Sequence, residues 1–318
     1  MSKALRRPVL VTGSHRSGST WVGRLLAAAD ELHYVQEPFN IVAHQRWMDP
    51  RPDRQFLHVT DSNEASWLAP MQQVVDLKYP LVSHLVRRPG VKMSRRATRV
   101  ALDARRARRV GAAAMIKDPI AVFSTPWIAR RFDAVPVVMV RDAVPFVGSL
   151  LDRRWSFDFE HWAGQPTLMA VLDPWADEIE RMAAQPAELI DQAILMWNAI
   201  YGFVADLPTE LARFGIEAHI ESYETIASNP LVEVEGLFAR VGLQFGVEQQ
   251  RVVNELSTGR SGGDDGTGVS AIDVRRDSSA AMETWRDRLN DAQIDHIAAS
   301  TAEVARRVGS AVRRPDGV

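Results

Sequence analysis

The chain has 318 residues, of which 46% are hydrophobic and 25% are charged, so it can bury a large core and is not disordered overall. Its formal net charge of −2 argues against a general polyanion binder and leaves room for a local basic pocket. The absence of cysteine excludes disulfides, thiolate metal sites and cysteine catalysis. No apolar stretch reaches the roughly 18 residues that span a bilayer. The start of the chain shows no signal-peptide pattern before Gly13. We therefore expect a cytoplasmic protein.

The first part of the chain alternates short β-branched runs with helical patterns. The expected elements are a strand over 8–12, a helix over 19–29, a strand over 33–36, an irregular excursion over 41–80, an arginine-rich helix over 92–109, a strand over 112–116 and a helix over 122–131. We interpret residues 41–110 as an insertion, because four prolines interrupt the pattern between 50 and 80.

The second part continues the alternation. The expected elements are a strand over 136–140, a helix over 145–154, an aromatic loop over 155–162, a helix over 187–207, a strand over 218–221, helices over 231–241 and 248–256, and a terminal helix over 290–308. This order predicts an α/β fold, a P-loop-like open and mostly parallel sheet flanked by helices, with helical and loop insertions. We expect a single domain over 1–318, with the Gly- and Ser-rich segment of about 257–284 as a mobile lid.

Five chemistry-bearing residues fall at or just after the ends of predicted strands: Arg16, Glu37, Lys117, Arg141 and Tyr223. In open parallel sheets, ligands bind at the carboxyl ends of the strands. The sequence therefore predicts that these side chains share one site.

The loop Gly13–Thr20 matches the phosphate-binding pattern G-x-x-x-x-G-K-[ST] except that Ser19 replaces the lysine. Backbone N–H groups at such a turn, with the helix that follows, form a cradle for an anion. A loop without the lysine is poorly equipped for a β/γ-phosphate pair with Mg²⁺. Arg16 supplies a cation whose planar fork suits tetrahedral oxyanions. The alternative is an ordinary glycine-containing turn.

The segment His15–Trp21, which reads His-Arg-Ser-Gly-Ser-Thr-Trp, resembles the 5′-phosphosulfate-binding loop of the sulfotransferases that use 3′-phosphoadenosine 5′-phosphosulfate (PAPS). The resemblance implies PAPS as co-substrate. It also implies that the nucleotide is held by Arg16, Ser17, Gly18, Ser19, Thr20 and Trp21.

Arg141 ends a predicted strand, and Ser149 follows eight residues later in the second turn of a predicted helix. This spacing resembles the motif with which the same family binds the 3′-phosphate. Taken alone, Arg141 could pair with Asp142 or Asp118, and Ser149 could be an indifferent helix residue. Together with the first loop, the pair favours nucleotide binding.

Two further segments carry weaker resemblances. Tyr223 lies in a Tyr-Glu segment that implies a place beside the adenine, and the alternative is a tyrosine that caps a strand–helix junction. Ser270 stands where the tyrosylprotein-type branch has a serine that contacts the phosphosulfate, and a flexible surface loop is an equal alternative there. We interpret Trp197 as core packing.

The catalytic residues are inferred from the Lys117-Asp118-Pro119 segment. Small-molecule sulfotransferases carry a histidine base in the corresponding Lys-x-His segment. The tyrosylprotein-type and several bacterial branches, which have Lys-Asp-Pro and a glutamate base, are therefore a better match. Glu37, 21 residues after Arg16, is the expected general base, with a surface or capping role as the alternative. Lys117 is expected to stabilise the leaving oxygen together with Arg16, or else to pair with Asp118.

The resemblance predicts transfer of a sulfuryl group from PAPS to an acceptor hydroxyl, with release of adenosine 3′,5′-bisphosphate. The alternatives are a P-loop kinase and a non-catalytic nucleotide-binding protein. The eight histidines show no metal-binding spacing, so no metal is expected. The acceptor is a small molecule, glycan, lipid or peptide, and no nucleic acid partner is expected; the oligomeric state cannot be read from the sequence. A stretch of nine arginines either forms a solvated helix or binds an anion: Arg87, Arg88, Arg95, Arg96, Arg99, Arg105, Arg106, Arg108 and Arg109.

Overall fold

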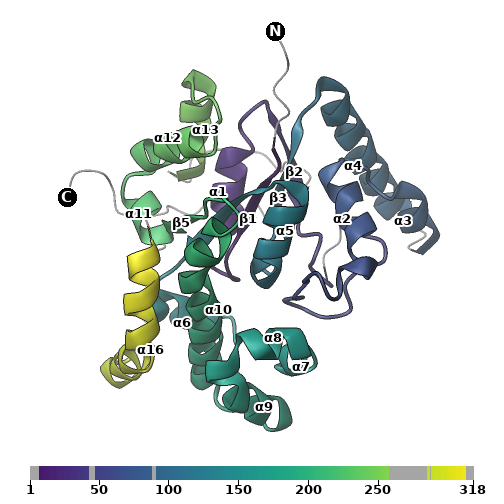
Figure 1. Ribbon diagram of the computed structural model, residues 1–318. Coiled ribbons are helices and arrows are strands. Elements are labelled where there is room, and N and C mark those ends of the chain that lie inside the picture. Colours follow the sequence, from purple (N-terminus) through teal and green to yellow (C-terminus); the bar gives the residue numbers. More distant parts are fainter. Residues whose placement is uncertain (1–6, 43–46, 88–90, 258–284, 287, 313–318) are drawn as a thin grey trace.

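The computed structural model describes residues 7–42, 47–87, 91–257, 285–286 and 288–312. Within them, five parallel strands form one sheet in the order β2-β3-β1-β4-β5 (Figure 1). The strands are β1 (Val9–Thr12), β2 (Leu32–Gln36), β3 (Ala113–Lys117), β4 (Val135–Val140) and β5 (His219–Ser222). The α/β fold predicted from the sequence is confirmed.

Helices connect the strands and cover the sheet. They are α1 (Ser19–Leu26), α2 (Leu68–Val75), α3 (Leu81–Arg87), α4 (Val91–Val110), α5 (Thr125–Phe132), α6 (Ala143–Asp152), α7 (Glu160–Ala163), α8 (Pro166–Val171), α9 (Ala176–Ala184), α10 (Leu189–Ala212), α11 (Tyr223–Ser228), α12 (Pro230–Arg240), α13 (Val247–Ser257) and α16 (Asp291–Ala311).

The sheet is buried on both faces, because alternate residues of each strand belong to different hydrophobic clusters. Leu10 and Val138 point into the larger cluster, which includes side chains of α5, α6, α10 and α16. Val11 and Val137 point into the smaller one, which lies under α1, α12 and α13. Burial on both faces explains why β1 and β4 read as continuous apolar runs rather than alternating ones.

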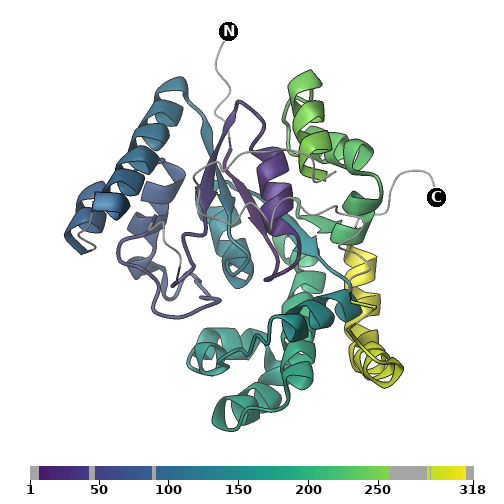
Figure 2. The same ribbon diagram turned by 180° about the vertical axis from the view of Figure 1, so that it is seen from behind.

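The helices divide into groups around this core (Figures 1 and 2). The insertion helices α2, α3 and α4 lie at the β2 edge, and α11, α12 and α13 lie at the β5 edge. The long helix α10 packs against α6 and α16, and α7, α8 and α9 gather at its first half. The sheet order places β1 between β3 and β4, so the chain reverses its winding direction beside β1. In α/β sheets that point is where ligands bind.

Candidate active site

The loop between β1 and α1 depends on two glycines with positive φ. Gly13 has φ 142°, and a Cβ there would lie 2.3 Å from the Met139 carbonyl oxygen. Gly18 has φ 88°, and a Cβ there would lie 2.4 Å from Cδ2 of Tyr223. Ser17 Oγ donates to the Ser14 carbonyl at 2.7 Å and so fixes the turn from inside. The loop can therefore approach a ligand closely with bare backbone.

Helix α1 begins directly after this loop, so the positive end of its dipole lies there. Gly18 is the N-cap of α1, and no side chain caps the helix. The N–H groups of the first turn and the helix dipole both favour an anion there. Ser14 Oγ is buried in the same loop without a hydrogen-bond partner among the described residues. These features fit a phosphate or sulfate oxygen.

The two motifs that the sequence predicts to bind anions lie side by side, although more than 120 residues separate them. Arg16 Nε donates to Ser149 Oγ at 2.9 Å, and Arg141 Nη1 donates to the Arg16 carbonyl at 2.8 Å. Arg16 reaches this position from a left-handed backbone conformation, with φ 63°. These contacts link Arg16 of the β1–α1 loop to Arg141 before α6 and to Ser149 within it.

Aromatic residues hold Arg141 in place. Its guanidinium carbon lies 5.1 Å from the ring centroid of Tyr223, whose ring packs edge-on against Trp21 at 5.8 Å. Trp197 Nε1 donates to the Arg141 carbonyl at 2.9 Å. Trp197 is buried, as expected for core packing, but its contact with Arg141 was not predicted from the sequence. Ser222, rather than Tyr223, caps α11 by accepting from Thr225 N.

Glu37 lies at the end of β2 and is fixed by the neighbouring strand end. Its N–H donates to the Lys117 carbonyl at 2.8 Å, and its Oε1 forms an ion pair with Lys117 Nζ. Asn40 Nδ2 donates to the other carboxylate oxygen at 2.7 Å. Asp118 Oδ2 accepts a hydrogen bond from Phe39 N at 2.6 Å and so fixes the backbone that follows Glu37. The direct ion-pair partner of Lys117 is thus Glu37.

The electrostatics of this cluster leave one negative charge on Glu37. Burial raises the pKa of Glu37, but the charge and hydrogen bond of Lys117 outweigh it and leave the pKa below its ordinary value. Burial likewise works against the charge of Lys117, whereas Tyr34 and Glu37 raise its pKa above the usual value. Burial, reinforced by the charge of Glu37, raises the pKa of Asp118 to about 8. At neutral pH Glu37 is therefore ionised, whereas burial favours the protonated form of Asp118 against the backbone hydrogen bonds of Phe39 and Ile120.

His15 belongs to the same cluster, and sequence reasoning assigned it no role. Burial lowers its pKa to about 4, with opposing electrostatic effects from Glu37 and from Lys117 and Arg16. Its ring centroid lies 4.5 Å from that of Trp155 and 5.3 Å from that of Phe56. His15 is thus a neutral imidazole between an aromatic wall and the carboxylate. The sequence indicated that His15 lies near the site only through its position in the predicted loop, between Gly13 and Arg16.

A cavity of about 380 Å³ opens beside Arg16. Its other lining residues come from one loop, Arg153, Arg154, Trp155 and Ser156. Because Trp155 packs on His15, this wall continues toward Glu37. The other aromatic residues of this loop, Phe157, Phe159 and Trp162, are buried and belong to the core.

The predicted site residues are placed as follows. Arg16, Ser17, Gly18, Ser19, Thr20 and Trp21 form the loop and first turn of α1, and Arg141, Ser149 and Tyr223 adjoin them. Glu37 and Lys117 form an ion pair at the ends of β2 and β3. Ser270 lies outside the described residues. Trp285 packs over α6 beside Ser149, since a Cβ on Gly148 would lie 3.0 Å from its Cβ.

The carboxyl edge of the parallel sheet carries two arginines and a helix N-terminus that follows a glycine-containing loop. This arrangement is that of an α/β protein with a P-loop-like candidate site for an anion. A sequence model described as "Sulfotransferase family" matches residues 8–197, which is more than half of the chain. The chain therefore belongs to the sulfotransferase family. It is a sulfotransferase, an enzyme that moves a sulfuryl group from a donor to an acceptor, and this assignment takes the place of the kinase and the non-catalytic protein weighed as alternatives.

Three solved structures are similar to this chain. The sulfotransferase domain from the curacin biosynthetic pathway is 13% identical with a TM-score of 0.48, and the match covers 98% of this chain and 99% of that one. The sulfotransferase domain from the Synechococcus PCC 7002 olefin synthase is 12% identical with a TM-score of 0.48, covering 99% and 98%. Sulfotransferase STF1 from Mycobacterium tuberculosis H37Rv is 15% identical with a TM-score of 0.35, covering 87% and 77%. No curated protein sequence matches the chain.

Among the described helices, none combines the length and the apolar character needed to cross a membrane.

Proposed function

We propose that this sulfotransferase takes its sulfuryl group from PAPS and transfers it to an acceptor hydroxyl, releasing adenosine 3′,5′-bisphosphate. The observation that carries the proposal is the hydrogen bond between Arg16 Nε and Ser149 Oγ. It joins the loop that resembles a 5′-phosphosulfate site to the motif that resembles a 3′-phosphate site. A nucleotide with phosphate groups at both positions matches two arginine-bearing segments in direct contact.

The donor-binding residues follow from this arrangement. The 5′ end would be held by the backbone of the loop and by the side chains of Arg16, Ser17, Ser19, Thr20 and Trp21, with Gly18 allowing close approach. Arg141 and Ser149 would hold the 3′-phosphate, and Tyr223 would pack beside the adenine. Ser270 remains a further predicted contact. No metal is part of the proposal.

Glu37 is the proposed general base, and its Oε1 would accept the proton of the acceptor hydroxyl. The carboxylate is ionised at neutral pH and is held in place by Lys117 and Asn40. While Lys117 Nζ contacts it, however, the carboxylate is a weak base. Once Lys117 Nζ turns from Glu37 toward the leaving oxygen, the largest effect that opposes burial is lost and the pKa of Glu37 rises, with the Asn40 hydrogen bond still in place. A single movement of Lys117 would thus strengthen the base and stabilise the leaving group.

Arg16 and the N-terminus of α1 supply the remaining positive charge for the leaving oxygen. The cavity beside Arg16 and Trp155 is the proposed entrance for the acceptor, because its wall continues through His15 toward Glu37. The acceptor remains a small molecule, glycan, lipid or peptide. The single domain over 1–318 and the cytoplasmic location also stay predictions.

Glu37→Gln tests the proposal, because it keeps the shape of the side chain and removes the base. We expect turnover to fall by about 10²- to 10⁴-fold while the affinity for adenosine 3′,5′-bisphosphate stays within about threefold. Mass spectrometry of products that gain one sulfate measures turnover, and calorimetry measures affinity.

Glu221→Gln is the matched control, since Glu221 is also buried and forms an ion pair with Arg240 at 2.7 Å on another part of the sheet. The control should lose stability and keep its turnover per folded molecule. Near-normal turnover in Glu37→Gln refutes the role of Glu37 as base.

A further inference from the structure

Helix α4 concentrates positive charge in a chain whose net charge is −2. Between Ser94 and Val110 it carries seven arginines and a single acidic residue, Asp103. The seven arginines are Arg95, Arg96, Arg99, Arg105, Arg106, Arg108 and Arg109. Because the rest of the chain is acidic, this helix gives the molecule a strong charge asymmetry. Such an asymmetry orients a protein toward an anionic surface.

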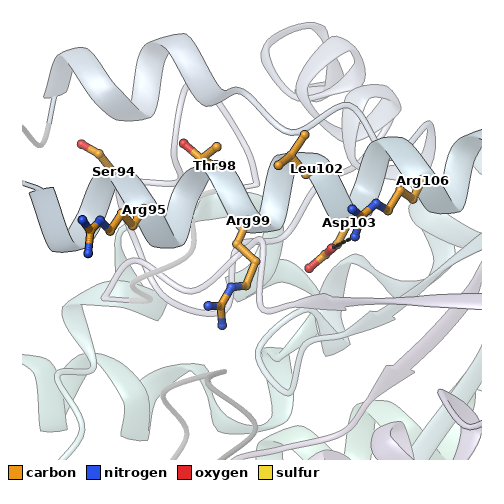
Figure 3. A pocket seen from close by; sticks show the side chains of 7 residues that line it. All are labelled: Ser94, Arg95, Thr98, Arg99, Leu102, Asp103 and Arg106. Atoms are coloured by element: carbon orange, nitrogen blue, oxygen red, sulfur yellow. Dashed lines mark ion pairs between the residues drawn. The ribbon is translucent and has the colours of Figure 1, made fainter.

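Three of these arginines, Arg95, Arg99 and Arg106, line an open groove of about 730 Å³ on one side of α4 (Figure 3). In Figure 3, Ser94, Thr98 and Leu102 form one row and Arg95 and Arg99 form the row beside it. Within the described part of the chain, no carboxylate lies at ion-pair distance from Arg95 or Arg99. Arg106 pairs with Asp103 at 3.5 Å, so the groove presents the cations Arg95 and Arg99 beside one ion pair.

Apolar side chains are exposed on α4 and on the helix that packs against it. Leu102 is 48% exposed, between Arg99 and Arg106 along the helix. The adjoining helix α3, which packs against α4, exposes Val82 by 76% and Val86 by 75%, one turn apart (Figures 1 and 2). Water contact at these positions is unfavourable for the free protein. A ligand that both neutralises the arginines and removes the apolar groups from water would relieve it.

A bilayer with anionic headgroups has both properties. Basic side chains reach the headgroups while their stems and nearby apolar groups enter the interface. A nucleic acid backbone would meet the charge and leave the valines in water. We propose that the α3–α4 surface, defined as Val82, Val86, Arg95, Arg99, Leu102 and Arg106, docks this sulfotransferase on an anionic membrane surface. The proposal is independent of the donor and of the acceptor.

Sedimentation with vesicles tests this docking. The full chain is mixed with vesicles of phosphatidylglycerol and phosphatidylcholine in equal parts, and with vesicles of phosphatidylcholine alone. We expect binding to the anionic vesicles only, weakened as the salt rises from about 0.1 M to 0.3 M. Replacing Arg95, Arg99 and Arg106 together by Gln should lower the partition coefficient about 100-fold, because each basic residue near such a surface contributes about fivefold.

Two further variants separate the contributions. Val82→Ser with Val86→Ser should weaken binding several-fold at both salt concentrations, since that contribution is hydrophobic. The matched control replaces three exposed arginines elsewhere, Arg181, Arg213 and Arg306, by Gln and should bind like the original chain. Circular dichroism confirms that each variant is folded.

Three results would overturn the docking proposal. The first is the absence of binding to anionic vesicles, and the second is an equal loss of binding in the control and in the α4 variant. The third is tighter binding to a short DNA duplex than to the vesicles, which would assign the surface to nucleic acid.

Discussion

Gly18→Ala tests the claim that the β1–α1 loop and Tyr223 form one tightly packed unit. The added Cβ would lie 2.4 Å from Cδ2 of Tyr223, about 1 Å closer than ordinary contact, and the ring cannot retreat freely. Tyr223 is only 8% exposed and packs against Trp21 and Arg141. The backbone at residue 18 is also left-handed, with φ 88°. The substitution therefore combines backbone strain with a steric overlap.

The two costs can be estimated separately. A left-handed conformation costs an alanine about 1–2 kcal/mol, and overpacking of a buried ring costs about 1–3 kcal/mol. The free energy of unfolding should therefore fall by about 2–5 kcal/mol. The entropy of unfolding is about 2.1 cal/mol/K per residue, so a chain of this length loses about 1.5 °C of Tm per kcal/mol. The expected drop in Tm is about 3–8 °C.

A double-mutant cycle isolates the overlap. In a Tyr223→Ala background the ring is gone, and Gly18→Ala should cost only the backbone strain, about 1–2 kcal/mol. Urea unfolding of the four proteins gives the coupling energy, which should be about 1–3 kcal/mol. An identical cost of Gly18→Ala in both backgrounds would show that the loop and the ring do not pack as described.

Two other substitutions probe residues that support the site. Trp197→Phe removes the hydrogen bond to the Arg141 carbonyl. In a calorimetric titration, the affinity for adenosine 3′,5′-bisphosphate should fall about fivefold, which equals about 1 kcal/mol. An unchanged affinity argues against positioning of Arg141 by Trp197. The pH dependence of stability tests the state of His15, whose pKa is about 4 in the folded protein and 6.5 in the unfolded chain. Because the unfolded chain takes up the proton first, the free energy of unfolding falls as the pH falls from about 6.5 to 4. Between pH 7 and pH 5 this amounts to about 2 kcal/mol, and His15→Asn should make the stability profile flatter by that amount in urea unfolding; an unchanged slope contradicts the buried neutral imidazole.

The sheet was predictable because its strands are short apolar runs that end in glycine or charge. Residues 8–12 and 136–140 were expected as strands and form β1 and β4 within one residue. The segment between α6 and α10 was harder to predict. The expected loop of aromatic residues after α6 leads into α7, α8 and α9, which are short helices stabilised by tertiary contacts with α10 rather than by strong local signals. Helix α10 also runs through Pro208, which sequence reasoning treats as a boundary.

Much of the candidate site followed from one rule, that the ends of parallel strands lie at one edge. The contacts between residues did not follow from it. For Lys117, the sequence suggested a role at the leaving oxygen or an ion pair with Asp118, and the pairing with Glu37 was not foreseen, because a distance along the chain does not fix a side-chain rotamer. The sequence also left open whether the pKa of Glu37 would be raised or lowered. That sign depends on whether burial or a nearby cation dominates, and the cation's position is known only from the structure.

The central claim is that the two arginine motifs bind one nucleotide with phosphate groups at both its 3′ and 5′ positions. Calorimetric titration with adenosine 3′,5′-bisphosphate and with adenosine 5′-monophosphate, both in the presence of a metal chelator, tests it most directly. Because each charge-assisted hydrogen bond to the 3′-phosphate contributes about 1.5–3 kcal/mol, the bisphosphate should bind at least about tenfold more tightly. That preference should disappear in Arg141→Gln. Equal affinities for the two nucleotides in the original chain would contradict the account.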